Sequence, residues 1–586
     1  MKEQIAELIA SAVDALLADG TLPSETQPKI MVENTRDKSH GDFASNIALT
    51  LAKPARRNPR ELAQALVAAL PQSDVIEKTE IAGPGFINFF VTQASTAAVV
   101  EQILTEKADF GRNRAEEKDR IQVEFVSANP TGPLHVGHGR GAAYGASVAD
   151  LLEAAGVPVE REYYVNDAGR QMNILGTSVW LRYLEKCGGE LTFPSNGYKG
   201  DYIHDIAASV FEAHGDQYNR PVADVMKDIP ADEPQGGDKE VHIDALIDRA
   251  RELLGEEGYG IFFDAALDSI LGDIRDDLSG FGVNYQEWFS ERGLTSNGDV
   301  ESALNTLQDN GYLYENNGNL WFRSTDFGDD KDRVVRRANG QTTYFASDIA
   351  YLKNKFERGF DKVLYIWGAD HHGYIARMKA ACQALGYAPE RMMVRLVQFA
   401  ILYRGEERVQ MSTRSGSFVT LRELREEVGN DACRFFYVTR KADQHMDFDL
   451  ELAKSESKDN PVYYIQYAHA RVRSVQRKLA ENGWDWDQEA GLANLTQLST
   501  EHEKDLITKL SKYPEVLTNA AVNYEPHMLA NYLRELANDF HSYYNANKML
   551  IEDAELRNAR ITLSEAARQV IHNGLTLLGV NAPEQM

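Results

Sequence analysis

Two histidines, His135 and His138, stand three residues apart just after a segment that predicts a buried strand. Gly137 and Gly139 alternate with them and leave the backbone open to a ligand, because glycine carries no side chain. At the start of a helix, this spacing brings imidazole donors, free backbone amides and the positive end of the helix dipole together. Such a point suits a nucleotide triphosphate. The alternatives are capping or core histidines, or a metal site, although no third ligand with suitable spacing is nearby.

A second candidate is the segment over residues 408–416, RVQMSTRSG in one-letter code. It follows a predicted strand and is rich in small hydroxyl residues and glycine. Met411 and Ser412 lie at its centre, and Arg414 is its cation. A loop of this composition can close on a triphosphate and neutralise charge on the departing pyrophosphate. The alternative is a solvated turn with a spare arginine.

Acidic residues beside aromatic or histidine side chains form a third group of candidates. Tyr344 and Asp348 are four residues apart, so they share a face if a helix begins near residue 346. A buried carboxylate beside a tyrosine suits a guanidinium or ammonium ligand, whereas an Asp near a helix start can also simply cap backbone amides. Asp370 and His371 follow another predicted strand and could contact a ribose or a substrate.

Short β-rich runs alternate with helical patterns in the middle of the chain. Strands are predicted over residues 121–126, 159–165, 363–367 and 394–401, and helices over residues 139–155 and 375–385. Strands that alternate with helices indicate a parallel, doubly wound sheet of the Rossmann-like type. Ligands bind such sheets beyond the carboxyl ends of the strands, which is where the histidine turn would lie.

The chain is too long for a single core, since 586 residues exceed the size at which chains split into domains. We expect a multidomain α/β protein with an amino-terminal α/β domain over residues 1–115 and a central domain over residues 116–455. A polar insertion interrupts the central domain at about residues 190–300. Apolar residues recur at helical spacing over residues 456–586, which indicates an all-α bundle.

Composition favours a protein of a reducing compartment. Cys187, Cys382 and Cys433 are scattered and form no CxxC pair, which argues against a disulfide framework and against a cysteine zinc site. Residues 5–17 predict an amphipathic helix with acidic residues rather than a targeting peptide. No apolar run approaches the length that spans a bilayer. We therefore expect a cytoplasmic protein without a membrane partner.

A net charge of −27 argues, taken alone, against nucleic-acid binding. The charge is unevenly distributed, however. Residues 201–260 hold fifteen Asp and Glu against five Lys and Arg, whereas residues 454–480 hold six basic residues against two acids. Because phosphates respond to local potential within about 8 to 10 Å, a basic stripe can act on an acidic protein. The overall charge leaves nucleic-acid binding open.

Several longer motifs accompany these candidates along the chain. They are HGDFASN at 40–46, EFVSANPTGP at 124–133, HVGH at 135–138, YYVNDAGRQ at 163–171, QMSTR at 410–414 and YAHAR at 467–471. HVGH resembles the HIGH signature, and QMSTR resembles a degenerate KMSKS loop. Together and in this order, the motifs resemble the arginyl-tRNA synthetase family of the class I aminoacyl-tRNA synthetases.

The resemblance covers nearly the whole chain and implies a role for each matching residue. It assigns arginine binding to Glu124, Asn129, His138, Tyr344, Asp348 and His371, ATP binding to His135, Gly137, His138, Gly139, Asp370, Met411 and Ser412, and catalysis to His135, His138 and Arg414. It assigns no metal ligand; Mg²⁺ is expected to screen the triphosphate. Carboxylates suit a forked guanidinium, and lysine would leave some of their acceptors unpaired.

The resemblance also implies the reaction. The arginine carboxylate attacks the α-phosphorus of ATP and releases pyrophosphate, and a ribose hydroxyl of tRNA(Arg) then attacks the acyl carbon of the adenylate. Such chemistry depends on positioning and charge stabilisation, so no nucleophile or general base is assigned to the protein. The amino-terminal domain and the helical bundle are expected to bind tRNA(Arg), and the protein is expected to be a monomer.

Two positions depart from the family pattern. Gln410 and Thr413 stand where KMSKS has lysines, and no lysine precedes HVGH in the PTGP segment over residues 130–133. Arg414 is then the main local cation of the loop. Gln585 stands where an arginine often precedes the last methionine.

Other functions compete with this interpretation. A tRNA-independent ligase that makes a small-molecule adenylate would share the HxGH turn but would leave the outer domains without a task. A synthetase-like regulator without catalysis is disfavoured by the intact His135 and His138 and by Tyr344 with Asp348. Among the synthetases, the cysteinyl and glutamyl enzymes are the nearest competitors, and the cysteinyl enzymes typically need a zinc site.

Overall fold

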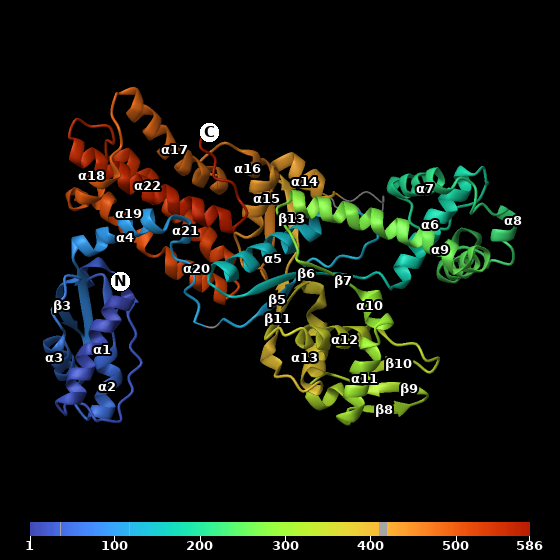
Figure 1. Cartoon of the computed structure of the whole chain (residues 1–586), viewed down its shortest axis with the longest axis horizontal. Helices are drawn as coiled ribbons and strands as arrows, with labels where there is room; N and C mark the ends of the chain where they lie inside the picture. Colours follow the sequence, from blue (N-terminus) through green and yellow to red (C-terminus); the bar gives the residue numbers. More distant parts are fainter. Residues whose placement is uncertain (36, 117, 410–418) are drawn as a thin grey trace.

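The computed structural model describes residues 1–35, 37–116, 118–409 and 419–586. At its centre lies a five-stranded sheet in the order β12-β11-β5-β6-β7, in which all neighbours are parallel (Figure 1). Its strands are β5 (Ile121–Glu124), β6 (Val159–Val165), β7 (Glu287–Ser290), β11 (Lys362–Gly368) and β12 (Met392–Val397). This arrangement confirms the predicted Rossmann-like fold.

Both faces of this sheet are covered. Along β11, Leu364 and Ile366 join one hydrophobic cluster, whereas Val363 and Tyr365 join another. Successive strand residues point to opposite faces, so each cluster marks one face. The first contains α5 (Val136–Ala154), and the second contains α12 (Tyr344–Glu357) and α13 (Ile375–Ala384).

Helix α5 lies very close to the loop that follows β5. A Cβ atom on Gly145 would lie 2.3 Å from the ring of Phe125, so only glycine fits at this crossing. The helix runs from the HVGH turn into the interior of the molecule and is buried along most of its length. The close packing fixes the turn at the carboxyl end of the central strand.

The strand predicted over residues 394–401 is in fact two strands in different sheets. After β12 the chain turns at Gln398 and Phe399, and β13 (Ala400–Arg404) pairs with β14 (Glu407–Arg408) and β15 (Met446–Asp449). The turn is held by backbone and side-chain donors, since Gln398 N donates to Ala442 O and Arg140 Nη1 donates to Gln398 O. An apolar run alone does not reveal such a change of sheet.

The predicted insertion is mainly helical and extends away from the sheet (Figure 1). Its helices are α7 (Asp201–His214), α8 (Val222–Val225) and α9 (Lys239–Gly280), which is kinked at Gly255. Helices α7 and α9 pack on α6 (Arg170–Lys186), which precedes the predicted range. The last part of the range predicted as insertion belongs to the central domain, because β7 is a strand of the main sheet.

A smaller unit follows β7 and leads into α12. It contains α10 (Glu291–Ser296), α11 (Asp299–Asp309) and an antiparallel sheet of β8 (Leu313–Asn316), β9 (Asn319–Phe322) and β10 (Arg333–Arg336). Its apolar residues share a cluster with α12 and α13. It therefore supports α12 from the side opposite the sheet.

The amino-terminal unit has its own core, formed by residues between Ile5 and Phe89. Its elements are α1 (Lys2–Ala18), α2 (Ile47–Ala55), α3 (Pro59–Ala69) and a sheet of β1 (Glu33–Asn34), β2 (Phe43–Ser45), β4 (Phe86–Val91) and β3 (Ile76–Ala82). The next helix, α4 (Gln93–Glu106), packs instead on the carboxyl-terminal helices.

The carboxyl-terminal unit is helical, as predicted, and residues 450–586, all of which are described, contain no strand. Its helices are α17 (Pro461–Glu481), α18 (Gln488–Ala493), α19 (Glu501–Ser511), α20 (Tyr513–Val522), α21 (Pro526–Ala546) and α22 (Ala554–Leu577). The preceding α16 (Leu450–Lys454) packs on β13 and β15. Tyr144 on α5 donates to Tyr524 O at 2.7 Å and links the unit to the central sheet.

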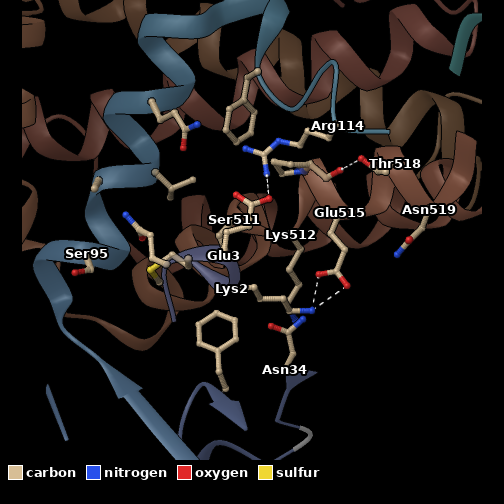
Figure 2. A pocket seen from close by; sticks show the side chains of 18 residues that line it. Lys2, Glu3, Asn34, Ser95, Arg114, Ser511, Lys512, Glu515, Thr518 and Asn519 are labelled. Atoms are coloured by element: carbon tan, nitrogen blue, oxygen red, sulfur yellow. Dashed lines mark hydrogen bonds and ion pairs between the residues drawn. The ribbon is translucent and has the colours of Figure 1, made fainter. Parts of the chain in front are cut away.

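A cavity of about 450 Å³ lies where the amino-terminal unit meets α20 (Figure 2). Lys2 Nζ contacts Glu515 at 2.7 Å across it, and Arg114 contacts Glu3 at 3.3 Å. These exposed pairs contribute little stability each, but they join segments far apart in sequence. Among the described residues, no helix is long and apolar enough to cross a membrane.

Candidate active site

The HVGH turn begins α5 with a capping box made of its two histidines. Gly137 N donates to His135 Nδ1 at 3.0 Å, and His135 N donates to His138 Nδ1 at 3.2 Å. The centroids of the two imidazole rings lie 3.8 Å apart. The capping alternative is therefore correct, and it also has a chemical consequence. Because both Nδ1 atoms accept, each neutral ring carries its proton on Nε2, and that N–H remains a donor.

Both histidines are neutral at physiological pH. Burial lowers the pKa of His135, and burial together with the neighbouring His135 lowers the pKa of His138 to about 3. The turn thus offers uncharged donors at the positive end of a helix dipole. Among the described residues, no group of three or more His, Cys, Asp or Glu could hold a metal ion.

The chain reverses sharply between β5 and this turn. Val126 and Ser127 have φ values of 68° and 42°, a left-handed conformation that is rare for a β-branched residue. Ser127 Oγ donates to Glu124 Oε1 at 3.2 Å and accepts from Tyr164 N at 3.1 Å. The strain and its tethers hold Glu124 and the following segment at the carboxyl ends of β5 and β6.

The exit of the QMSTR loop is attached to the HVGH turn. Val136 N donates to Val419 O at 3.1 Å, and Leu421 N donates to Leu134 O at 2.9 Å. Helix α14 (Leu421–Val428) then starts with Thr420 as its cap. The predicted Met411, Ser412 and Arg414 lie outside the described residues, so only the flanks of their loop are placed, beside the histidines.

A cavity of about 330 Å³ opens at the carboxyl ends of β6 and β7 and the start of α12. It is lined by Asn129, Tyr164, Asn166, Gly169, Gln171, Glu291, Tyr344 and Asp348. Three residues predicted for arginine binding, Asn129, Tyr344 and Asp348, therefore meet in one cavity. Asn129 Nδ2 donates to Gln171 Oε1 at 2.8 Å, and Asn166 Nδ2 donates to Asn129 Oδ1 at 3.2 Å, which makes a polar wall.

Asp348 lies in the first turns of α12 but does not cap it. Thr343 is the cap, and its hydroxyl accepts from Ala346 N. The helix begins at Tyr344, slightly earlier than predicted, so Tyr344 and Asp348 share a face, and Tyr344 is 60% exposed. Burial raises the pKa of Asp348 to about 7, while a hydrogen bond from Tyr374 opposes this shift.

Glu291 is a cavity residue that sequence reasoning missed. It directly follows β7, and burial together with Asp348 and Asp167 raises its pKa to about 7. Within the described part of the chain, its Oε2 has no hydrogen-bond partner. Asp167 fixes this corner, because it accepts from Ser290 Oγ at 2.6 Å and from Arg292 N at 2.9 Å. The sequence signal that could have revealed this strand, and Glu291 after it, was the short Glu-Trp-Phe run of β7, which lay inside the range predicted as insertion.

Glu124 lies outside the lining of this cavity. It is 7% exposed, and its Oε2 is 2.5 Å from Lys355 Nζ. Its charge still reaches the cavity, since it contributes to the raised pKa of Asp348. Glu124 is thus a buried neighbour of the cavity, and its carboxylate is shared with a lysine that the sequence did not single out.

Asp370 and His371 lie apart from the cavity lining, on the 3₁₀ turn Ala369–Tyr374 after β11. Their side chains are 64% and 61% exposed and contact each other at 3.6 Å. Phe399, at the turn after β12, is also exposed, and its ring lies 3.4 Å from the position of a Cβ atom built on Gly137. An exposed aromatic ring beside an open glycine backbone offers a stacking surface near the histidines.

The edge of the sheet therefore carries two chemically distinct parts. One is a neutral donor cluster at a helix start, suited to phosphate oxygens. The other is a cavity lined by two carboxyls, the half-buried Asp348 and the buried Glu291, and it suits a cation with several N–H donors. Together they can hold a cationic small molecule next to a nucleotide.

Comparisons with known proteins agree with this geometry. Three family models match: the arginyl tRNA synthetase N terminal domain over residues 3–91, the class I (R) tRNA synthetase catalytic domain over residues 99–192 and 278–454, and the DALR anticodon binding domain over residues 465–586. Curated arginine–tRNA ligases from Thioalkalivibrio sulfidiphilus and Legionella pneumophila are 61% and 58% identical to this chain, and each alignment covers 100% of both sequences.

Solved structures give the same result. An arginyl-tRNA synthetase structure from Campylobacter jejuni superimposes with a TM-score of 0.73 at 32% identity, over 85% of this chain and 100% of that chain. The Thermus thermophilus arginyl-tRNA synthetase superimposes with a TM-score of 0.71 over 100% of both chains, and at 23% identity it supports the fold alone. With full-length relatives above half identity, the chain belongs to the arginyl-tRNA synthetase family of the class I aminoacyl-tRNA synthetases.

Proposed function

We propose that the protein is an arginine–tRNA ligase, which activates L-arginine with ATP and transfers it to the terminal adenosine of tRNA(Arg). The observation that carries the substrate assignment is a pair of carboxyls, the half-buried Asp348 and the buried Glu291, that line one cavity. Two carboxylates can accept the forked N–H donors of a guanidinium, and their burial makes each charge-assisted hydrogen bond strong.

The same cavity is proposed to favour arginine over lysine. Lysine would place one ammonium where the site presents acceptors on two carboxylates and a tyrosine, and some of those acceptors would stay unpaired. Asn129 is proposed to hold the amino-acid end of arginine, with Glu124 acting on the site from behind the cavity and His371 as an outer contact. His138 is proposed to lie between the two halves of the site, near the reacting carboxylate.

The histidine turn is proposed to act on ATP. The Nε2–H groups of His135 and His138 would donate to oxygens around the α-phosphorus, and Gly137 would lie against the triphosphate at the start of α5. Gly139, also predicted for ATP binding, is buried, and a Cβ atom there would lie 2.8 Å from Tyr437 Oη, so packing requires this glycine. The arginine carboxylate forms the new O–P bond, and the bond to pyrophosphate breaks with its electron pair. The attacking carboxylate is already ionised, so the step needs no general base.

The remaining groups of the ATP site are proposed from sequence. Asp370 would contact the nucleotide, while Met411 and Ser412 would line the triphosphate, and Arg414 would neutralise pyrophosphate. Mg²⁺, which prefers phosphate oxygens and water, would screen the triphosphate when bound. The protein is proposed to act as a monomer.

The outer units are proposed to bind tRNA(Arg). The match of residues 465–586 to an anticodon binding domain supports a role for the bundle, and the basic residues over 454–480, four of which lie on α17, are proposed to supply the charge. The amino-terminal unit, which the sequence predicts over residues 1–115 and whose family match covers residues 3–91, would contact a second part of the same tRNA.

The proposal is tested by arginine-dependent ATP–pyrophosphate exchange. Exchange is measured with each of the twenty amino acids, with and without tRNA(Arg), and aminoacylation is measured with the same tRNA. We expect exchange with arginine and with no other amino acid. Equal or greater exchange with another amino acid would overturn the substrate assignment, and exchange without aminoacylation would indicate a tRNA-independent ligase.

A further inference from the structure

Helix α12 carries a cation in the protein interior next to the arginine cavity. Asp348, Tyr351 and Lys355 recur at intervals of three and four residues, so they lie along one face of the helix. The Lys355 side chain is 0% exposed, and its Nζ contacts Glu124 Oε2 at 2.5 Å. The ammonium also lies over the rings of Tyr351 and Tyr365, 4.2 and 3.9 Å from their centroids.

A second buried pair lies one turn further along. Arg358 donates to the Glu162 carboxylate from both terminal nitrogens, Nη1 and Nη2, at 2.6 and 3.0 Å, and Tyr351 donates to the same carboxylate. Four carboxyls, Glu124, Glu162, Glu291 and Asp348, thus lie near the ends of β5, β6, β7 and α12. Two of them, Glu124 and Glu162, are matched by cations of the protein, and the other two face the cavity.

The division into two paired and two unpaired carboxyls matters because buried charges of the same sign repel one another strongly unless a cation offsets them. Charged and titratable groups surround the Lys355–Glu124 pair on every element packed against it. Those of the sheet and the segments beside it are Glu162 and Tyr164 on β6, Tyr365 on β11, Tyr285 before β7 and Glu291 after β7. Those of α12 and its end are Asp348, Tyr351 and Arg358, and Tyr374 and Arg377 lie beside Asp348. Lys355 is the cation in direct contact with Glu124.

We propose that Lys355 is a positioning residue for arginine recognition. It neutralises Glu124, fixes the carboxylate so that Oε1 stays with Ser127, and thereby confines the uncompensated negative charge to Asp348 and Glu291. The guanidinium then has one place to bind, and the substrate enters in one orientation. This inference rests on the proposed function, since the readout is arginine activation.

The test compares Lys355→Met with Lys355→Arg, which keeps the charge, and with Lys353→Met. Lys353 lies on the same helix but pairs with Glu357, so its loss removes a lysine without touching the cavity. Arginine and ATP KM values are measured by ATP–pyrophosphate exchange from pH 6 to pH 9, and Tm is measured for each variant.

We expect Lys355→Met to raise the arginine KM about tenfold or more at pH 7.5, with the ATP KM changed less than about twofold. Without the lysine, the charge of Glu124 is no longer offset and raises the pKa of Asp348 further. The pH midpoint of the arginine KM then moves upward, by about one unit. Lys355→Arg should restore the midpoint, and Lys353→Met should behave like the unaltered protein.

A double variant separates positioning from simple structural support. Removing the orphaned charge with Glu124→Gln in the Lys355→Met background should restore Tm, the pH midpoint and most of the arginine KM, because the uncompensated charge is again confined to Asp348 and Glu291, while the ATP KM stays unchanged throughout. A Lys355→Met protein with unchanged arginine KM and midpoint would overturn the inference. So would a parallel rise of both KM values that the double variant repairs completely. If the unaltered protein shows no arginine-dependent exchange, the proposed function fails instead.

Discussion

The histidine turn and the arginine cavity lie at the same edge of one sheet, yet burial acts on them in opposite ways. Burial keeps His135 and His138 neutral, with the pKa of His138 lowered to about 3. It raises the pKa of Asp348 and of Glu291 to about 7, so these carboxyls ionise within the physiological range. The comparison shows how one sheet edge can hold a pH-insensitive phosphate site beside a pH-sensitive cation site.

The largest expected effect tests the cavity. Asp348→Asn should raise the arginine KM by about 100-fold or more, because a buried guanidinium would lose its ionised partner. The ATP KM should change little. The measurement is ATP–pyrophosphate exchange at varied arginine and varied ATP, and equal changes in both KM values would remove Asp348 from arginine recognition.

The next effect tests the histidine turn, where capping and chemistry must be separated. His135→Asn keeps a good helix cap but removes the Nε2–H donor, so kcat should fall about 100-fold while Tm stays near its original value. His138→Ala should slow adenylate formation similarly without unfolding the chain. Unchanged kcat in a stable His135→Asn protein would reduce this residue to a cap.

A smaller effect is expected at the residue that the sequence did not reveal. Glu291→Gln keeps the shape of the side chain and removes one charge, so the arginine KM should rise about tenfold. The change should lower the pH midpoint of the arginine KM, because Asp348 would lose a repelling neighbour. A raised midpoint would contradict the coupling of the two carboxyls.

The smallest expected effect is the pH dependence itself. Between pH 8 and pH 6 the arginine KM should rise several-fold as the two carboxyls take up protons, whereas the neutral histidines should leave kcat flat. The stability of the ligand-free protein should change in the opposite sense. A carboxyl pKa raised by folding means that the native state binds more protons, so stability increases as the pH falls through 7. Asp348→Asn should weaken both trends, measured by exchange kinetics and by Tm.

Much of the architecture followed from the sequence because it is written in local patterns. The β-rich runs of β5, β6 and β11 and the apolar spacing of α5 and α13 predicted the doubly wound sheet, since burial on both faces requires such runs. The split of residues 394–401 into β12 and β13 was not predictable in this way. It depends on a donor from Arg140 and an acceptor from Ala442, which are distant in the chain.

The sequence by itself determined the family, the Rossmann-like centre and three residues that line the cavity, because residue type and spacing carry that information. Only the tertiary structure decided that Glu291 completes the cavity, that Glu124 lies behind it and that Lys355 neutralises Glu124. These facts concern charges on separate elements. Their effect depends on distance and burial, which no local pattern encodes.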